Sequence, residues 1–314
     1  MAATLLPDIT PAQRRRAGRE ILKFHHRLDE TGLFSDAALA RLIDETPRDR
    51  LSVRTVSAYA AEAWITGEAR DKTGVELVAA ARKGRLWIVA PTGGNIRYAR
   101  VFARLMDEFA HAMGLKVLDA EAEVVIASPR MGAAFHVDSA ETMVLHVRGA
   151  ETVEVHPPLG PHLGERQLEA ILREEVSADL PADRSLDEGA TPVMLQAGEA
   201  AWWPLHSPHR AVNGEGLNVS VNVTFASPRS RRLNGVVYTN GFLRRRLGLH
   251  PVSSRTPGLL QPAYLAAAQF LQSLRPHQEV TPRPPPRFEV DLDAPGCIRW
   301  RKGERPGPRR AAAA

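Results

Sequence analysis

Phe135-His136-Val137-Asp138 is the stretch of this sequence that says most about its fold. A histidine and an aspartate two residues apart in a strand-like segment point to the same face of a sheet, because side chains alternate along a strand with a period of two. An imidazole nitrogen and a carboxylate oxygen placed side by side supply two of the three ligands of a facial two-histidine-one-carboxylate iron site. The spacing therefore predicts a metal site that needs a third ligand from a distant strand.

The candidate third ligand lies in Pro204-Leu205-His206-Ser207-Pro208-His209, which leads into a second strand-rich stretch. His209 starts that strand and is the expected ligand, whereas its competitor His206 lies in the proline-flanked turn. His156 and His162 flank a proline-containing loop and are not expected to bind metal. Without a metal, His136 and Asp138 would simply hydrogen-bond to each other and His209 would cap a turn.

The composition is that of a globular protein. The chain has 314 residues, of which 44% are hydrophobic and 25% charged, enough to bury a sizeable core. No apolar run approaches the length of a membrane span, and polar residues follow the Arg14-Arg15-Arg16 cluster, so no signal peptide is expected. The single cysteine, Cys297, excludes an internal disulfide and a cysteine-based zinc cluster. We therefore expect a cytoplasmic protein.

The net charge of +5 does not by itself indicate a nucleic-acid partner. The excess lies largely in Arg244-Arg245-Arg246 and in a basic C-terminal stretch, and neither interleaves cations with aromatic side chains as a single-strand-binding face does. No helix-turn-helix or zinc-finger pattern is present. A solvated basic surface is the expected interpretation.

Helices are expected mainly before residue 118. Thr10 and Pro11 form a helix start, with an N-cap and a proline at the first position. Ser35 caps a second helix, and Gly84 and Gly114 end two more. The expected ranges are 10 to about 28, from 35 onward, 75–83 and 95–113.

Short β-branched segments separated by Gly or Pro dominate after residue 118. Two blocks of strands flank a helix expected at 164–176, and the first block carries the ligand pair while the second carries His209. This order predicts a mixed α and β fold with a double-stranded β-helix barrel, which gathers side chains from distant strands at one end. The expected strands are 123–128, 142–147, 152–155, 192–195, 200–203, 209–212 and 217–225.

The chain divides into four expected parts. A helical region, 1–118, packs on the barrel core, 119–235. A helical extension at 236–275 includes a helix over 261–274 and offers a surface through which two copies could form a homodimer. The Pro- and Arg-rich remainder, 276–314, is expected to be an extended or disordered tail.

A family resemblance rests on several of these motifs. Besides Phe135-His136-Val137-Asp138, they are Leu145-His146-Val147-Arg148-Gly149, the block from Trp203 to Arg210, and Asn218-Val219-Ser220-Val221-Asn222. Together they resemble the JmjC-like, cupin-like oxygenases, and more closely the bacterial cupin-like proteins of that group that are often labelled transcriptional regulators. The resemblance covers about residues 120–230, and more loosely the N-terminal helices and residues 240–245.

The resemblance implies a set of roles. The family's iron ligands correspond to His136, Asp138 and His209, and its polar co-substrate positions correspond to Thr142 and Asn222. The implied chemistry is Fe(II)- and 2-oxoglutarate-dependent oxidation, usually hydroxylation, of a small molecule or a protein or peptide side chain.

One position departs from the family. Where a lysine or arginine usually pairs with the distal carboxylate of 2-oxoglutarate, this chain has Glu151. A carboxylate facing a carboxylate repels it, especially when both are desolvated. Three explanations are open: Arg148 or Arg210 supplies the cation, the co-substrate differs, or the protein binds metal without turnover. The last would make it a non-catalytic metal-binding sensor or scaffold.

Overall fold

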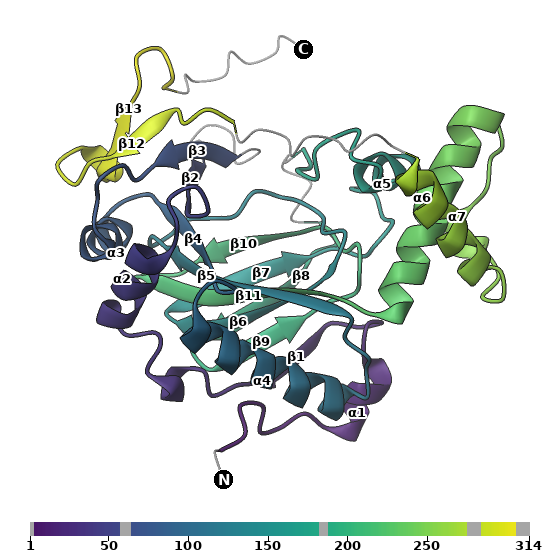
Figure 1. Ribbon diagram of the computed structural model, residues 1–314, viewed down its shortest axis with the longest axis horizontal. Coiled ribbons are helices and arrows are strands. Elements are labelled where there is room, and N and C mark those ends of the chain that lie inside the picture. The colour runs from purple at the N-terminus through teal and green to yellow at the C-terminus, as the bar shows by residue number, and fades with distance from the viewer. Residues whose placement is uncertain (1–2, 57–63, 182–187, 275–283, 306–314) are drawn as a thin grey trace.

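The computed structural model describes residues 3–56, 64–181, 188–274 and 284–305. Within these residues two sheets face each other (Figure 1). The larger sheet has the strand order β1-β9-β6-β11-β5-β4-β2-β3-β12-β13, and the smaller has the order β10-β7-β8. The predicted mixed α and β fold around a double-stranded β-helix is confirmed.

The strands come from all parts of the described chain. Their bounds are β1 Leu22–His25, β2 Ser52–Val56, β3 Trp64–Glu68, β4 Trp87–Pro91, β5 Asp119–Ala127, β6 Glu141–Arg148, β7 Ala150–Val155, β8 Thr191–Gln196, β9 Glu199–Trp202, β10 His209–Asn213, β11 Asn218–Ala226, β12 Phe288–Val290 and β13 Ile298–Trp300. The helices are α1 Pro11–Arg16, α2 Asp36–Glu45, α3 Gly74–Lys83, α4 Ile96–Met113, α5 Glu165–Leu172, α6 Pro228–Leu247 and α7 Gln261–Ser273.

The interior of the barrel is an apolar layer between the two sheets. Val144 on β6 and Val153 on β7 belong to it, so every second residue of these two strands faces inward. The whole buried cluster is Val144, Val153, Val155, Val193, Leu195, Ala201 and Trp203. The opposite face of the larger sheet packs on α4, which crosses it in Figure 1 and contributes Phe102, Leu105 and Phe109 to the main core.

The segment that carries His136 lies along the edge of the smaller sheet. Gly132 pairs with Val212 and His136 pairs with His209, both in antiparallel sense. The segment thus acts as an irregular extra strand beside β10, which places the His-x-Asp pair next to the start of β10.

The first predicted helix is wrong in its second half. Helix α1 ends at Arg16, and residues 22–25 form β1, which pairs with β9 of the larger sheet. Gly18 turns the chain in the left-handed region, φ +66°, which favours glycine, and Leu22 and Phe24 then point into the core while Lys23 and His25 stay exposed. Residues 1–118 also supply β2, β3 and β4 to that sheet.

The expected extended tail is also corrected in part. Strand β12 pairs in parallel with β3 and antiparallel with β13, and Phe288 is fully buried. The ring of Phe288 lies so close to Gly67 that a Cβ there would clash with it, so β3 needs a glycine at this point. The high proline content of this stretch favoured the prediction of an extended tail over strands. Residues 276–283 and 306–314 of the expected tail lie outside the described residues.

The other predicted helices are confirmed with small shifts. Ser35 caps α2, Asn95 caps α4, and Gly114 ends α4 in the left-handed conformation. Helix α6, which contains the residues 240–245, pairs with α7 at one side of the molecule (Figure 1). None of the helices in the described ranges is both long and apolar enough to cross a membrane.

His26 joins the N-terminal segment to the barrel, and its hydrogen bonds lead to a prediction about how stability depends on pH. Its Nδ1 accepts a hydrogen bond from the Leu28 amide and its Nε2 donates to the carbonyl of His146, 3.0 Å away. This pairing uses the neutral imidazole, and burial lowers the pKa of His26 to about 4.

We expect metal-free protein to lose stability as the pH falls from about 6.5 towards 4, because the unfolded chain then binds a proton that folded His26 does not. At pH 5 this one group should cost about 2 kcal/mol of unfolding free energy. The amide of glutamine in His26→Gln can still donate to the carbonyl. In this variant, the free energies of unfolding measured in urea at pH 7 and at pH 5 should differ by about 2 kcal/mol less than they do in wild type. Equal losses in the two proteins would refute the assignment.

Candidate metal centre

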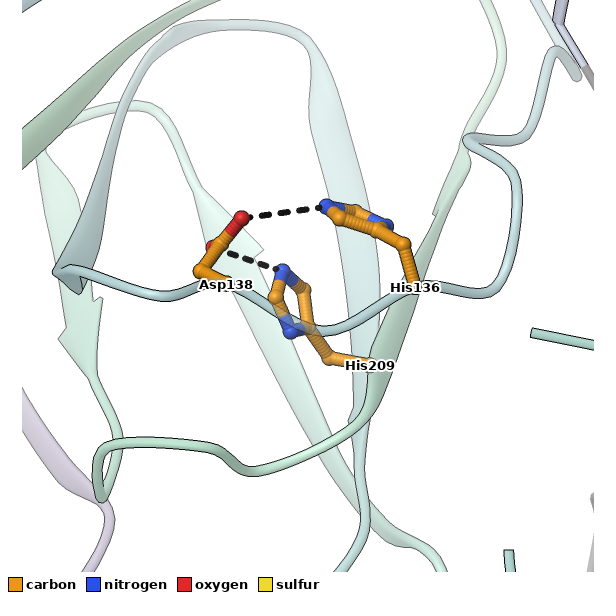
Figure 2. A group of neighbouring side chains, drawn as sticks. All are labelled: His136, Asp138 and His209. Atoms are coloured by element: carbon orange, nitrogen blue, oxygen red, sulfur yellow. Dashed lines mark ion pairs between the residues drawn. The ribbon is translucent and has the colours of Figure 1, made fainter. Parts of the chain in front are cut away.

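Three side chains converge at one end of the barrel. The Nε2 of His136 lies 3.8 Å from Oδ1 of Asp138, and the Nε2 of His209 lies 3.5 Å from Oδ2 (Figure 2). One ligand atom from each residue lies within 4.8 Å of the others. The structure thus brings together the three residues that the sequence singled out as ligands.

Backbone pairing holds the two histidines in register. The amide of His136 donates to the carbonyl of His209 over 3.0 Å, and the amide of His209 donates back to His136 over 2.9 Å. Residues directly opposite in an antiparallel pair project on the same side, and the two imidazole centroids are 4.3 Å apart. The spacing of these two candidate ligands is therefore a product of main-chain hydrogen bonds.

Both imidazoles are oriented for metal binding. The Nδ1 of His136 donates to the Ala134 carbonyl over 2.7 Å, and the Nδ1 of His209 donates to the Ser207 carbonyl over 3.0 Å. These hydrogen bonds assign the proton to Nδ1 and leave the lone pair of each Nε2 directed at Asp138. Metal-binding histidines characteristically have such an outer partner, so the donor set fits a divalent iron ion.

The ionisation states suit the same role. Burial lowers the pKa of His209 to about 4, so the ring is neutral near pH 7. Burial alone would raise the pKa of the Asp138 carboxyl, but the imidazoles of His209 and His136 and a hydrogen bond from Thr142 outweigh it and hold the pKa below its ordinary value. Neutral histidines and an ionised carboxylate are the forms that bind metal.

His206 lies outside this group of three. It occupies a turn with φ +65°, and its Nε2 contacts Oδ1 of Asn234 on α6 over 2.7 Å. The amide nitrogen of Asn234 in turn donates to the carbonyl of Ser139, the neighbour of Asp138, over 2.7 Å. Sequence reasoning missed Asn234, because only the fold brings α6 against both ligand-bearing segments.

The two histidines that were not expected to bind metal, His156 and His162, form an aromatic cluster with Phe135. The rings of His156 and His162 are 4.6 Å apart, and both pack edge-on against Phe135. Neither belongs to the group around Asp138.

Two of the four candidate co-substrate residues face the barrel interior. Thr142 lies on the same side of β6 as Val144 and helps to hold the pKa of the Asp138 carboxyl below its ordinary value. Asn222 on β11 is directly opposite Val144, so its side chain projects to the same side.

The two candidate arginines are engaged elsewhere. Arg148 donates to Asp36 over 2.7 Å and to the carbonyl of Phe34 over 3.1 Å, and Arg210 pairs with Glu154, its cross-strand neighbour. A register shift between β6 and β11 places Arg148 opposite Val219, whose side chain lies in the core on the α4 side. Neither arginine joins the interior group that surrounds Thr142 and Asn222.

Glu151 faces the barrel interior beside His146. It shares the inward side of β7 with Val153, and its Oε1 lies 3.4 Å from Nδ1 of His146. The side chains of His146 and Glu151 are 0% and 3% exposed. His146 was not among the predicted site residues, although its position four residues after Thr142 on one strand places both on the same side.

Of the comparisons with known proteins, only the comparison of structures found similar ones. Neither a protein-family model nor a curated protein sequence matches the chain. An X-ray structure of E. coli ycfD aligns over 88% of this chain and 70% of its own, with 16% identity and a TM-score of 0.51.

Two further structures of that E. coli protein give TM-scores of 0.48. One, described as a ribosomal oxygenase, aligns over 88% of this chain and 69% of its own at 15% identity. The other, a complex with cobalt and 2-oxoglutarate, aligns over 87% and 69% at 16% identity. At this level of sequence identity, the similarity supports a shared fold and nothing more. The chain thus has a double-stranded β-helix fold similar to that of E. coli ycfD.

Proposed function

We propose that the protein is a non-heme iron oxygenase that consumes a 2-oxo acid, with 2-oxoglutarate as the first candidate, and hydroxylates a small molecule or a protein side chain. The observation that carries this proposal is the group of His136, Asp138 and His209, with each Nε2 directed at the carboxylate. Two histidines and one carboxylate on one face of an octahedral ion are the ligand set of non-heme Fe(II) oxygenases.

Bound iron would supply the activation of dioxygen. In the net reaction, the 2-oxo acid loses carbon dioxide and takes up one oxygen atom to become a carboxylic acid one carbon shorter. The second oxygen atom enters a C–H bond of the substrate. Thr142 and Asn222 both lie on the inner face of the barrel, and we assign them the role of orienting the co-substrate.

A cavity of about 500 Å³ lies between the barrel and the helices after it, and we assign it to the substrate. Ser139, the neighbour of Asp138, lines it together with Asn234. Its wall also includes the polar side chains of Glu174, Arg231, Tyr238, Gln269 and Gln272. Amide and charged groups of this kind suit a polar substrate such as a peptide segment. Cytoplasmic location and pairing of two copies through the helices after the barrel stay predictions.

Anaerobic titration of the protein with Fe(II) tests the proposal. We expect one ion per chain, and a visible charge-transfer band when a 2-oxo acid is added. Admission of oxygen should then release the shortened acid, which is succinate for 2-oxoglutarate, in step with oxygen uptake. Asp138→Asn, which keeps the shape but removes the charge, should abolish both signals. Iron-loaded protein that neither binds nor decarboxylates any 2-oxo acid would refute the oxygenase proposal.

A second candidate function follows from Glu151. An acidic residue at the inner end of the barrel favours a protein that binds metal without turnover, as a sensor or scaffold. Stoichiometric iron binding without oxygen uptake is the result expected for that candidate.

A further inference from the structure

The end of the barrel away from the metal centre is polar. His146 and Glu151 face each other there, and the strand register adds one neighbour to each. Asn213 lies opposite Glu151 on β10, and Ser220 lies opposite His146 on β11. The four residues are between 0% and 5% exposed. A barrel that needed only to pack its core would fill this space with apolar side chains.

Several polar atoms in this place have no hydrogen-bond partner among the described residues. They are both ring nitrogens of His146 and Oε1 of Glu151, and this oxygen lies 3.4 Å from Nδ1 of His146. Buried polar atoms in proteins are almost always hydrogen-bonded. Three such atoms together therefore point to a polar group of a bound molecule that reaches this end of the barrel.

The strands connect this polar end to the metal centre. Along β7 and β10, Val155 is opposite His209 and Glu151 is opposite Asn213, so the polar end lies four residues farther along both strands. That is roughly 13 Å of strand. The inward side chains between the two ends include Val144 and Val153, which make this part of the interior apolar. A molecule held at the metal by a 2-oxo acid group thus has its far end directed at Glu151.

We infer that the co-substrate is a 2-oxo acid whose far end donates hydrogen bonds, such as a carboxamide, and is not a dicarboxylate. This inference rests on the proposed function. Glu151 offers an acceptor to an amide N–H, and a ring nitrogen of His146 can donate to the amide oxygen. A carboxylate in the same position would face Glu151, and the two candidate cations, Arg148 and Arg210, pair with Asp36 and Glu154 instead.

Two redox-inert analogues test the inference by binding alone. N-oxalylglycine has the shape of 2-oxoglutarate, and N-oxalylglycinamide differs only in a carboxamide at the far end. Isothermal titration of Mn²⁺-loaded protein should show the amide binding about tenfold to hundredfold more tightly than the acid, as expected for one hydrogen bond to a charged group. The isosteric Glu151→Gln should lose most of this preference, and Glu151→Lys should reverse it.

Thr152→Lys is the control, because it adds a lysine on the outward side of the same strand, leaves the Arg210–Glu154 pair in place and should keep the preference for the amide. Mn²⁺ binding is measured first, so a failure there counts against the metal centre and the proposed function. If the metal binds but wild-type protein takes the acid as tightly as the amide, or takes neither, the inference about the far end is overturned. An unchanged preference in Glu151→Gln overturns it as well.

Discussion

The His209→Ala variant should lose stoichiometric iron binding. The Nε2 of His209 faces Asp138, and among the described residues only the imidazoles of His136 and His209 belong to that group. Removing an outer partner of a metal ligand typically costs about 10–100-fold in affinity, and removing a ligand should cost more. Anaerobic titration with Fe(II), with the bound metal counted after gel filtration, measures the effect.

His206→Ala is the matched control and should bind iron within about tenfold of wild type, since His206 contacts Asn234 and not Asp138. His206→Asn is a gentler second control, because asparagine tolerates the left-handed backbone of this turn. The opposite ranking, with iron lost in the His206 variants and kept in His209→Ala, would show that the wrong third ligand was chosen.

The Glu151→Lys variant should bind 2-oxoglutarate about tenfold to hundredfold more tightly than wild type. The substitution replaces repulsion between two carboxylates by a charge-assisted hydrogen bond, worth roughly 1.5–3 kcal/mol. The longer lysine side chain also carries its ammonium farther along the barrel than the carboxylate of Glu151 reaches. Isothermal titration with the metal concentration held constant gives the two dissociation constants.

A buried lysine can destabilise the barrel, so thermal unfolding of the variant has to accompany the titration. Unchanged or weaker 2-oxoglutarate binding in a folded, metal-loaded Glu151→Lys protein would mean that a different residue sets the choice of co-substrate.

Much of the barrel could be predicted because most of its strands have a recognisable sequence pattern. Segments such as 142–147 and 217–225 are rich in β-branched residues and are bounded by glycine or proline. Strand β1 was missed because a good helix start at Thr10 was extended too far, and four residues carry little periodicity of their own. Strand β12 was missed because its partners β3 and β13 become visible only in the fold.

The candidate site was predictable to the extent that it depends on strand alternation. His136 and Asp138 follow from their spacing, and the choice between His206 and His209 follows from turn and strand signals. The direction of Arg148 could not be foreseen, because a shift in register between β6 and β11 decides which side it takes. The contact between His146 and Glu151 depends on how the two sheets face each other, and no local sequence pattern indicates how the sheets are placed.

The reciprocal hydrogen bonds between the main chains of His136 and His209 have a consequence for how the protein is handled. Since the chain itself sets the spacing, an ion can leave and another can enter while the barrel stays closed. Affinity for divalent first-row ions generally rises from manganese to copper, whatever ion the chemistry needs. Protein purified over nickel, or in buffers contaminated with zinc, would then be well folded, monodisperse and misloaded. Folding assays would not reveal the error, so metal content has to be measured in each preparation before its activity is judged.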